Sequence, residues 1–407
     1  MAAGVLQRWQ QAQAASDQLW RVLKPEAMLE RPIPERHRLV FYLGHLEAFD
    51  WNLLAPALDL KPFHAEWDKL FAFGIDPVDG ELPSDPPSAW PEVDAVGAYN
   101  RSARTGLQNA LARQGSRGLE QRLEVAIEHR WMHVETLSYL LHNLAYEHKQ
   151  PGPAPRAAAA PAERAAASAP AVEVPAGPVT LGQNQPRAFG WDNEFSAHQQ
   201  QVAAFLADRT KISNGDYLAF VNEGAAPPHF WRKHHGDWFY RGMFAQVPLP
   251  LDQPVYVTQA EAAAYCTWRG KRLPSEAEWH RLAYATPEGS ERSYPWGEAA
   301  PQAAAGNFDL RHWDPEPVSA YAASASAWGA EDLVGNGWEW TATPFAPFPG
   351  FKAFDFYPGY SANFFDGRHY VMKGGSARTA ACLLRRSFRN WFQPHYPYAY
   401  AGFRCVN

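Results

Sequence analysis

Two histidines four residues apart are the first feature of this sequence with a chemical use. They are His129 and His133, in the segment EHRWMHVETL. On a helix this spacing places both imidazoles on one face, roughly 6 Å apart. Two rings so placed can bind one metal ion. The alternative interpretation of such a pair is two ordinary surface or core histidines.

A third histidine strengthens the metal interpretation. His45, in FYLGHLEAFDW, lies on a separate predicted helix whose apolar face must point into the same core. Metal sites in helical bundles are commonly built from inward side chains on facing helices. Imidazole ligands suit zinc, copper, iron and nickel, so the ligand type leaves the metal open. Three other histidines are interpreted as solvated or structural: His64, His142 and His148.

Helices are needed to position these side chains, and the apolar spacing predicts a bundle of them. We expect an up-and-down arrangement of helices at 3–23, 37–57, 92–114 and 118–148. The last two carry apolar residues at steps of three and four, as an amphipathic helix does. Between the second and third helix, Pro62 to Pro91 is rich in proline, which predicts an extended crossover that lines a site.

An Ala- and Pro-rich stretch, residues 151–178, predicts a linker between two domains, residues 1–150 and 179–407. The C-terminal part consists mostly of short, turn-rich pieces. One helix there is signalled by RLPSEAEWHRLAYA, where Ser275 and Glu278 have capping-box spacing. A second helix is expected from Thr258 to Arg269.

Composition restricts the class of protein. A length of 407 residues with 46% hydrophobic content predicts two domains. The net charge of −6 and the scattered basic residues argue against nucleic acid as a partner. Because we find neither a signal peptide nor an apolar run of roughly 20 residues, we expect a soluble, cytoplasmic protein that does not enter a membrane. The cysteines, Cys266, Cys382 and Cys405, are expected to be buried thiols.

Nearly the whole chain resembles the EgtB-type sulfoxide synthases. HRWMHVE matches the HxxxHxE motif of that family, and GHLEAFDWN matches the helix that bears its first iron ligand. The C-terminal half matches through RLPSEAEWHRLA, YPWGE, GNGWEWT, KGGSA, SFRNW and GFR, in this order. The resemblance implies an α+β fold in two domains. A DinB-like four-helix bundle would precede a domain like formylglycine-generating enzyme and C-type lectins, with little regular secondary structure.

The resemblance also implies a cofactor and a reaction. The family uses Fe(II) and O2 to form a C–S bond, with sulfoxidation, between a thiol and the imidazole of a histidine derivative. His45, His129 and His133 would then bind the iron. Glu135, the last residue of the matched motif, would accept a hydrogen bond near the metal instead of binding it.

Residues of the C-terminal half are assigned roles by the same resemblance. A tyrosine of this family donates a proton or an electron during oxygen reduction, and DFYPGYSANFF places it at Tyr357, with Tyr360 beside the substrate. Asn390 and Trp391 match positions that contact the histidine-derived substrate. A Trp face can hold a trimethylammonium group by cation–π attraction. The alternative for the aromatic residues is core packing.

Departures from the family pattern concern the sulfur donor. Members that hold a substrate carboxylate with Gln have it where this chain has Met132, and a thioether cannot replace an amide donor. Members that use γ-glutamylcysteine have arginines in the crossover and Asp where this chain has Phe392. Cysteine, as in ovothiol synthases, or a neutral thiol or selenol such as a selenosugar, as in a selenoneine synthase, fits better. Asp76, Asp79 and Glu81 of the crossover are candidates to meet an amine, or form a solvated loop.

Two other functions were weighed. A formylglycine-generating activity needs a cysteine pair after the GGS motif, where GGSARTAACLL offers only Cys382. A non-catalytic ligand-binding module would be favoured by loss of the three histidines or of Tyr357, and all four residues are present. Both alternatives are therefore less favoured than the sulfoxide synthase.

Overall fold

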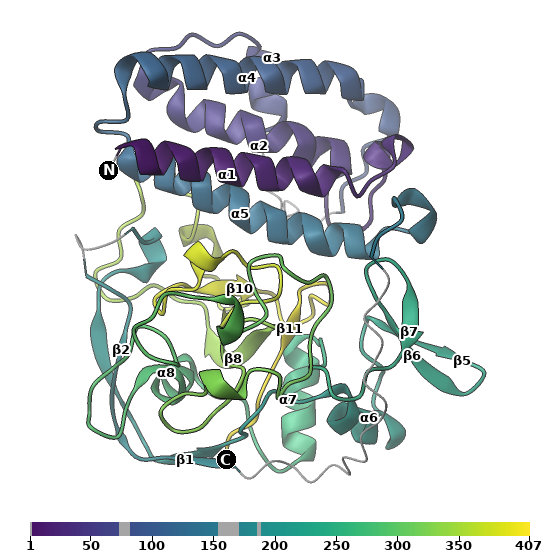
Figure 1. Ribbon diagram of the computed structural model, residues 1–407, viewed down its shortest axis with the longest axis vertical. Coiled ribbons are helices and arrows are strands. Elements are labelled where there is room, and N and C mark those ends of the chain that lie inside the picture. Colours follow the sequence, from purple (N-terminus) through teal and green to yellow (C-terminus); the bar gives the residue numbers. More distant parts are fainter. Residues whose placement is uncertain (1, 73–81, 154–170, 185–188) are drawn as a thin grey trace. The chain divides into compact units, whose positions relative to one another are not determined.

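The computed structural model describes residues 2–72, 82–153, 171–184 and 189–407 (Figure 1). The chain separates into two compact units, Met1–Ala154 and Pro155–Asn407. Unit 1 is helical, whereas unit 2 combines short strands, short helices and long irregular segments. This is the α+β class that the sequence predicts. Within the described residues, no helix has the length and apolar character that a membrane span requires.

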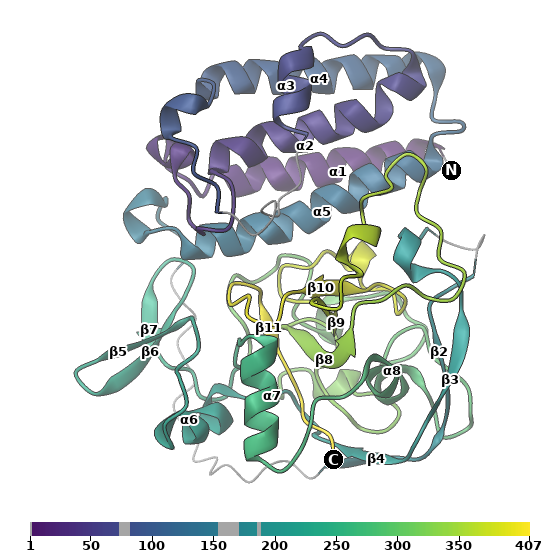
Figure 2. The same cartoon turned by 180° about the vertical axis from the view of Figure 1, so that it is seen from behind.

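Four long helices form unit 1, and Figures 1 and 2 show them side by side. They are α1 (Ala2–Trp20), α2 (Leu39–Leu54), α4 (Val93–Gln114) and α5 (Glu120–Asn143). Helix α1 packs against α5, and α2 packs against both α4 and α5. Most side chains of α2 are buried, so it is the central helix. The bounds agree with the predicted helices except at the end of α5, which stops before the short 3-10 turn Tyr146–His148.

The segment between α2 and α4 is not wholly extended, which corrects the sequence-based expectation. It contains the short helix α3 (Ala65–Leu70) and a 3-10 turn at Pro87–Ala89. Helix α3 is held by tertiary contacts that local sequence cannot reveal: the Asn52 side chain donates to Asp68 O at 2.8 Å, and Tyr99 donates to the Asp68 carboxylate at 2.7 Å. Three carboxylates of this segment lie outside the described residues: Asp76, Asp79 and Glu81.

Unit 2 contains several small sheets. Its strands are β1 (Val172–Val174), β2 (Gly177–Leu181), β3 (His198–Val202), β4 (Phe205–Ala207), β5 (Trp231–His234), β6 (Asp237–Arg241), β7 (Gln246–Pro248), β8 (Trp338–Pro344), β9 (Tyr370–Lys373), β10 (Asn390–Phe392) and β11 (Ala401–Gly402). The largest sheet has the order β10-β9-β8-β11, with β11 parallel to β8. The remaining pairs are antiparallel: β1 with β4, β2 with β3, and the meander β5-β6-β7.

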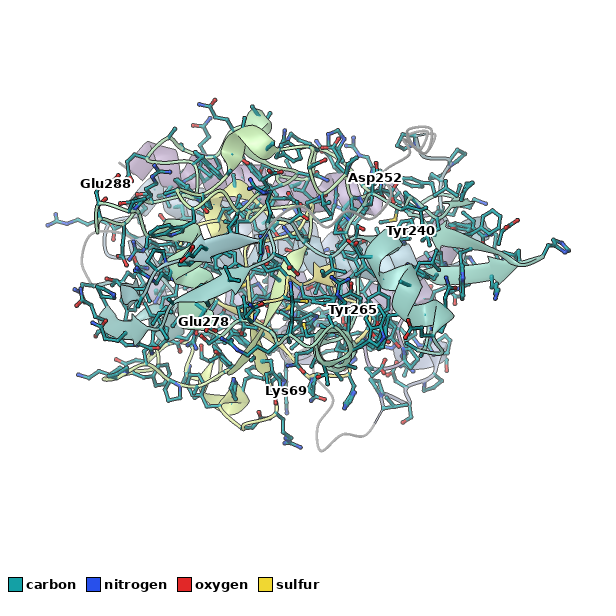
Figure 3. All side chains as sticks on the ribbon, turned by 90° about the horizontal axis from the view of Figure 1, so that it is seen from below. Lys69, Tyr240, Asp252, Tyr265, Glu278 and Glu288 are labelled. Atoms are coloured by element: carbon teal, nitrogen blue, oxygen red, sulfur yellow. The ribbon has the colours of Figure 1, made fainter. Side chains whose placement is uncertain are left out.

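Three helices accompany these sheets: α6 (Asn214–Asn222), α7 (Gln259–Trp268) and α8 (Glu276–Tyr284). Both helix predictions for this half are confirmed. Ser275 caps α8, accepting from the backbone N–H of Glu278 at 3.2 Å, and the Glu278 carboxylate accepts from the Ser275 N–H at 2.8 Å. Figure 3 labels Glu278 on α8 and Tyr265 on α7.

Two expectations for this half are wrong in part. The predicted linker, 151–178, ends too late, because Val172 and Val174 are buried in β1 and pair with β4. Residues 154–170 lie outside the described part of the chain. Of the three cysteines, Cys266 and Cys405 are buried with their Sγ atoms 3.2 Å apart, but Cys382 is exposed. It lies in the 3-10 turn Ala381–Leu383, at the surface.

Candidate metal centre

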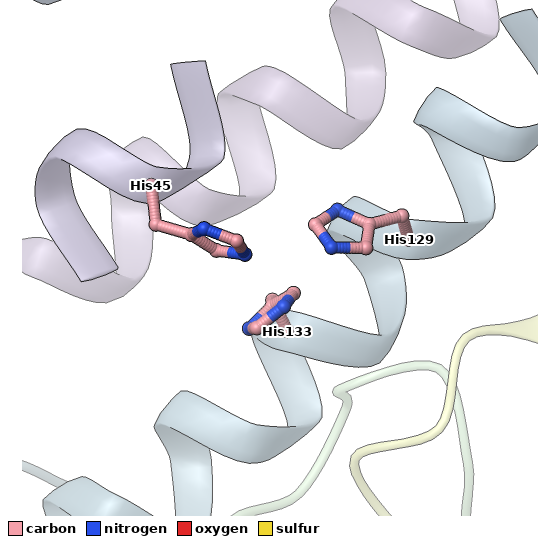
Figure 4. A group of neighbouring side chains, drawn as sticks. All are labelled: His45, His129 and His133. Atoms are coloured by element: carbon pink, nitrogen blue, oxygen red, sulfur yellow. The ribbon is translucent and has the colours of Figure 1, made fainter. Parts of the chain in front are cut away.

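The three histidines singled out from the sequence converge inside unit 1. One nitrogen of each of His45, His129 and His133 lies within 4.8 Å of the other two, and all three residues are buried. Figure 4 shows His45 reaching from α2 toward the two rings that α5 presents. Their ring centroids are 4.4 to 5.3 Å apart. The i, i+4 spacing on α5 therefore produces the shared face that it predicts.

A buried ion cluster fixes α2 against α5 next to these ligands. Arg130, the neighbour of His129, donates to Glu47 at 2.9 Å and to Asp50 at 2.8 Å. It also donates to Leu46 O, one residue after His45, at 2.8 Å. Because the guanidinium donates to several acceptors of α2, it sets the register in which His45 faces α5. No local sequence pattern marked Arg130 as part of the site.

The orientation of the His45 ring is set by the backbone of the crossover. Its Nδ1 lies 2.6 Å from Phe71 O, so Nδ1 carries the proton and Nε2 keeps its lone pair. Gly44 makes this approach possible. A Cβ at Gly44 would lie 2.6 Å from the Phe71 ring, closer than real contacts allow. Helix α3 and Gly44 thus act together to present the acceptor to His45.

Aromatic rings cover the ligands on two sides. Phe49 stacks on His129 with ring centroids 3.4 Å apart and an interplanar angle of 9°. Phe41 stacks on His45 at 5.1 Å. These apolar faces restrict the rotation of the imidazoles and lower the local polarity.

Burial keeps the three imidazoles neutral. It lowers the pKa of His45 to about 4, although the hydrogen bond to Phe71 O opposes the shift. Burial also lowers the pKa of His129 and of His133 well below the usual value, and the neighbouring histidines add to the effect. Neutral imidazole is the form that binds a metal ion, so the electrostatics favour a metal over a proton.

The donor set fits a bound cation. The Nδ1 atoms of His129 and His133 are buried without a hydrogen-bond partner among the described residues. Unpaired buried polar atoms are costly, and a metal ion drawing on the ring nitrogens would compensate part of that cost. Three nitrogen ligands also leave coordination positions open for small molecules. Within the described residues, this is the single group of His, Cys, Asp and Glu that meets the geometric requirement of a metal site.

The other two site residues expected on α5 flank this centre in sequence. Glu135 is buried two residues after His133, and it does not belong to the group of three ligands. Met132 is half-buried on the same helix. That Glu135 acts beside the metal and not as a ligand stays a prediction.

In unit 2 the structure brings the predicted aromatic residues together. The Tyr360 ring lies 5.7 Å from that of Tyr357 and 5.4 Å from that of Trp391. Asn390 and Phe392 flank Trp391 in β10. The Asn390 side chain accepts from the Trp391 N–H at 2.9 Å. Segments 30 residues apart in the sequence thus form one aromatic cluster.

Sequence reasoning missed the residues that hold this cluster. Trp191 stacks on Tyr360 at 3.8 Å. The Ser361 hydroxyl donates to the Asp192 carboxylate, and Asn193 donates to the Ser361 oxygen at 2.9 Å. These contacts join positions almost 170 residues apart, so no spacing rule could find them. In the sequence, the only feature that marks these supporting residues is the polar run DNE directly after Trp191.

A second support lies directly before Asn390. Arg389 is buried and donates through Nε and Nη2 to Glu276, at 3.0 and 3.1 Å. It also donates to Ala346 O at 3.0 Å, which ties β10 to the segment that follows β8. A pair of ions so deeply buried fixes the backbone of the Asn390 and Trp391 segment.

Comparison with known proteins defines the class. Residues 156–407 match the family described as sulfatase-modifying factor enzyme 1-like domain. The hercynine oxygenase of Mycolicibacterium thermoresistibile is 40% identical over 242 residues, which cover 54% of this chain and 54% of that protein. Ergothioneine biosynthesis protein 1 of Schizosaccharomyces pombe is 30% identical, over 95% of this chain and 54% of that protein.

More distant likenesses concern unit 2. The formylglycine-generating enzyme of Bos taurus is 30% identical over 220 residues, 42% of this chain and 57% of that protein. The solved structure of PvdO from Pseudomonas aeruginosa covers 58% of this chain and 93% of its own, with a TM-score of 0.42 and 20% identity. A likeness at that level carries no functional information.

The chain therefore belongs to the sulfatase-modifying factor enzyme 1-like family, and it is similar to hercynine oxygenases and to ergothioneine biosynthesis protein 1. The hercynine oxygenases are longer proteins than the region in which they match this chain. This chain spans 54 to 63% of the length of the mycobacterial hercynine oxygenases.

Proposed function

We propose that this protein is a sulfoxide synthase that uses Fe(II) and O2 to join a thiol or selenol to the imidazole carbon of a histidine derivative. The observation that carries the proposal is the convergence of three buried, neutral imidazoles in unit 1. The names of its relatives, hercynine oxygenase and ergothioneine biosynthesis protein 1, support the same chemistry.

His45, His129 and His133 are the residues that would hold the iron. When bound, Fe(II) supplies the activation of O2, which protein side chains alone cannot provide. The work of the chain is to keep the imidazoles neutral and fixed. Burial, the hydrogen bond to Phe71 O and the stacked Phe49 ring support that task.

Tyr357 is the proposed proton or electron donor, and Tyr360, Asn390 and Trp391 are proposed to hold the histidine derivative. The clustering of their aromatic rings supports one shared role for the two segments. A planar imidazole would stack on such rings, and an amide such as Asn390 can accept or donate a hydrogen bond.

The donor is proposed to be cysteine or a neutral thiol or selenol, including a selenosugar, and not γ-glutamylcysteine. Phe392 supports this choice because it lacks the charge with which the Asp of the other members can meet an ammonium group. Met132 supports it because a thioether cannot donate a hydrogen bond to a carboxylate. The additional charged groups of γ-glutamylcysteine would therefore be desolvated at these two positions without a compensating ion pair, which is unfavourable.

The direct test is anaerobic loading with Fe(II), addition of O2, and mass spectrometry of the products. The imidazole substrates are histidine and its trimethylated derivative hercynine. Each is combined with cysteine, γ-glutamylcysteine and a selenosugar. We expect a C–S or C–Se product with hercynine or histidine, and less product with γ-glutamylcysteine than with a donor of lower charge. If no pair gives a product, the protein binds its ligand without turnover and the proposal is wrong.

Tyr357→Phe separates the tyrosine's role from that of the metal. The variant should keep its iron and its fold but lose most product formation or divert O2 reduction, because general acid–base groups contribute roughly 10²–10⁴-fold. Tyr294→Phe is the control, since it removes a hydroxyl beside Trp296. Equal rates and products in Tyr357→Phe and the parent protein would exclude Tyr357 from the mechanism.

No observation favours a formylglycine-generating activity. Cys266 and Cys405 lie close together but are fully buried, and neither lies in the segment GGSARTAACLL that begins with the GGS motif. Cys382, which does follow it, is exposed and lies in a different segment from the buried pair.

A further inference from the structure

A cavity of about 640 Å³ lies within unit 2, away from the residues proposed to act in catalysis. It is bounded by the β2 strand and the turn before it, by the last turns of α8 and by the segment from Ala285 to Glu291. Neither the three histidines nor the aromatic cluster around Tyr360 contributes to its wall. A separate site for a separate small molecule is therefore geometrically possible.

Arg281 in the wall of this cavity is a buried cation whose side-chain hydrogen bonds go to backbone carbonyls, with the Glu291 carboxylate near enough to attract it. It is 7% exposed. Its Nε donates to Pro175 O at 2.7 Å and its Nη1 to Pro178 O at 2.8 Å, both of which are backbone carbonyls. Burial lowers the pKa of Arg281, and the attraction of the nearby Glu291 carboxylate opposes the shift.

The other charges of the wall compensate each other. Arg386 donates to Glu291 at 2.7 Å, and the second oxygen of Glu291 accepts from the backbone N–H of Thr180 at 2.6 Å. The wall thus contains two guanidinium groups and one carboxylate, which leaves one positive charge in excess. A net charge in a partly buried wall is costly, and a monoanionic ligand would neutralise the excess.

Apolar and hydroxyl groups complete the wall. The Trp328 ring lies 5.7 Å from the Arg281 guanidinium, and its indole N–H donates to Arg281 O at 3.0 Å. Thr286 and Ser290 share a hydrogen bond of 2.8 Å between their hydroxyls. Pro175 and Pro287 add apolar surface. Figure 3 shows Glu288, from the same turn, at the periphery of the molecule.

We propose that this cavity binds a small molecule with one carboxylate on an apolar body, and that Arg281 pairs with the carboxylate. The planar guanidinium fork matches the two oxygens of a carboxylate. One excess positive charge matches one negative charge, and the Trp328 face matches the apolar body. Small-molecule sites commonly combine apolar surface with a few convergent polar groups that orient the ligand.

The test uses benzoate as the probe, with neutral benzamide and inorganic phosphate as comparisons, in calorimetric titrations of the whole chain at low salt. We expect benzoate to bind, and benzamide and phosphate to bind at least roughly tenfold more weakly, because a charge-assisted hydrogen bond is lost or the charge is mismatched. Arg281→Gln should weaken benzoate by roughly tenfold or more. The charge control is Arg368→Gln, whose side chain is 78% exposed.

A second variant decides the question if Arg281→Gln fails to fold. Gln199 on β3 lines the cavity and is exposed, so Gln199→Trp should fill the space without disturbing the core and should abolish benzoate binding. Gln200→Trp places the same ring on the opposite face of the strand and should bind benzoate as the parent protein does. The proposal is overturned if benzoate does not bind, or if it binds equally to Gln199→Trp and Gln200→Trp.

Discussion

The histidine cluster of unit 1 and the aromatic cluster of unit 2 are built in opposite ways. His45, His129 and His133 lie on two long helices, and the spacing of two of them on α5 already places them on one face. Tyr357 lies on irregular backbone, and Trp391 lies on the short strand β10. There the positions depend on contacts such as those of Asp192 with Ser361 and of Arg389 with Glu276.

This difference indicates which substitutions should displace the residues of each site. A ligand on a long helix keeps its place as long as the register between helices is kept, so the sensitive residues in unit 1 are those that join α2 to α5 or set the His45 ring. A ligand-contacting residue outside a long helix depends on individual hydrogen bonds from distant segments. Losses in unit 2 should therefore be small and local.

The largest effect is expected where the register of the helices is fixed. Arg130→Met leaves Glu47 and Asp50 buried without their cation, which should reduce the free energy of unfolding by about 3–5 kcal/mol. Urea unfolding followed by circular dichroism, which reports mainly on helices, measures this change. Arg101→Met, at an exposed position of α4, is the control. A loss below about 1 kcal/mol for Arg130→Met would mean that the cluster does not fix the register.

An intermediate effect is expected where the His45 ring is oriented. The new methyl group in Gly44→Ala must displace the Phe71 ring, which should cost about 1–3 kcal/mol and weaken metal affinity roughly tenfold, because the acceptor of His45 Nδ1 moves. Metal competition titrations measure the affinity. In Gly97→Ala the methyl group meets only the Arg101 side chain at 3.4 Å, so that variant should keep the parent affinity. Equal affinities in both variants would contradict the role of Phe71.

The smallest effect is expected in the support of the aromatic cluster. Ser361→Ala removes two buried hydrogen bonds, one to Asp192 and one from Asn193, and should cost about 1–2 kcal/mol of stability. Metal content should not change, because the ligands belong to the other unit. Metal analysis and thermal unfolding of the same sample measure both quantities. A loss of bound metal in Ser361→Ala would show that the two sites are not built independently.

The helices and the shared face of His129 and His133 could be predicted because their signal is local. The step of four residues between His129 and His133, and the apolar periodicity of α5, depend only on helix geometry. The capping box of Ser275 and Glu278 is local in the same way. In each case the information lies within a few residues of the chain.

The remaining features could not be predicted because they depend on long-range contacts. Helix α3 is anchored by Asn52 and Tyr99, which lie outside its own segment. The predicted linker extends too far, into β1, for a similar reason. The residues of β1 form a strand because they pair with the distant strand β4. The roles of Arg130 and Asp192 depend on partners far along the chain. The composition of the chain and the spacing of its residues do not predict such long-range partners.

The central claim is that three histidines of unit 1 form one iron site. Its most direct test is elemental analysis of protein loaded anaerobically with Fe(II), for the parent chain, His133→Ala and His148→Ala. We predict about one iron per chain for the parent and for His148→Ala, whose side chain is not part of the cluster, and nearly none for His133→Ala. Full iron occupancy in a folded His133→Ala protein would contradict the account.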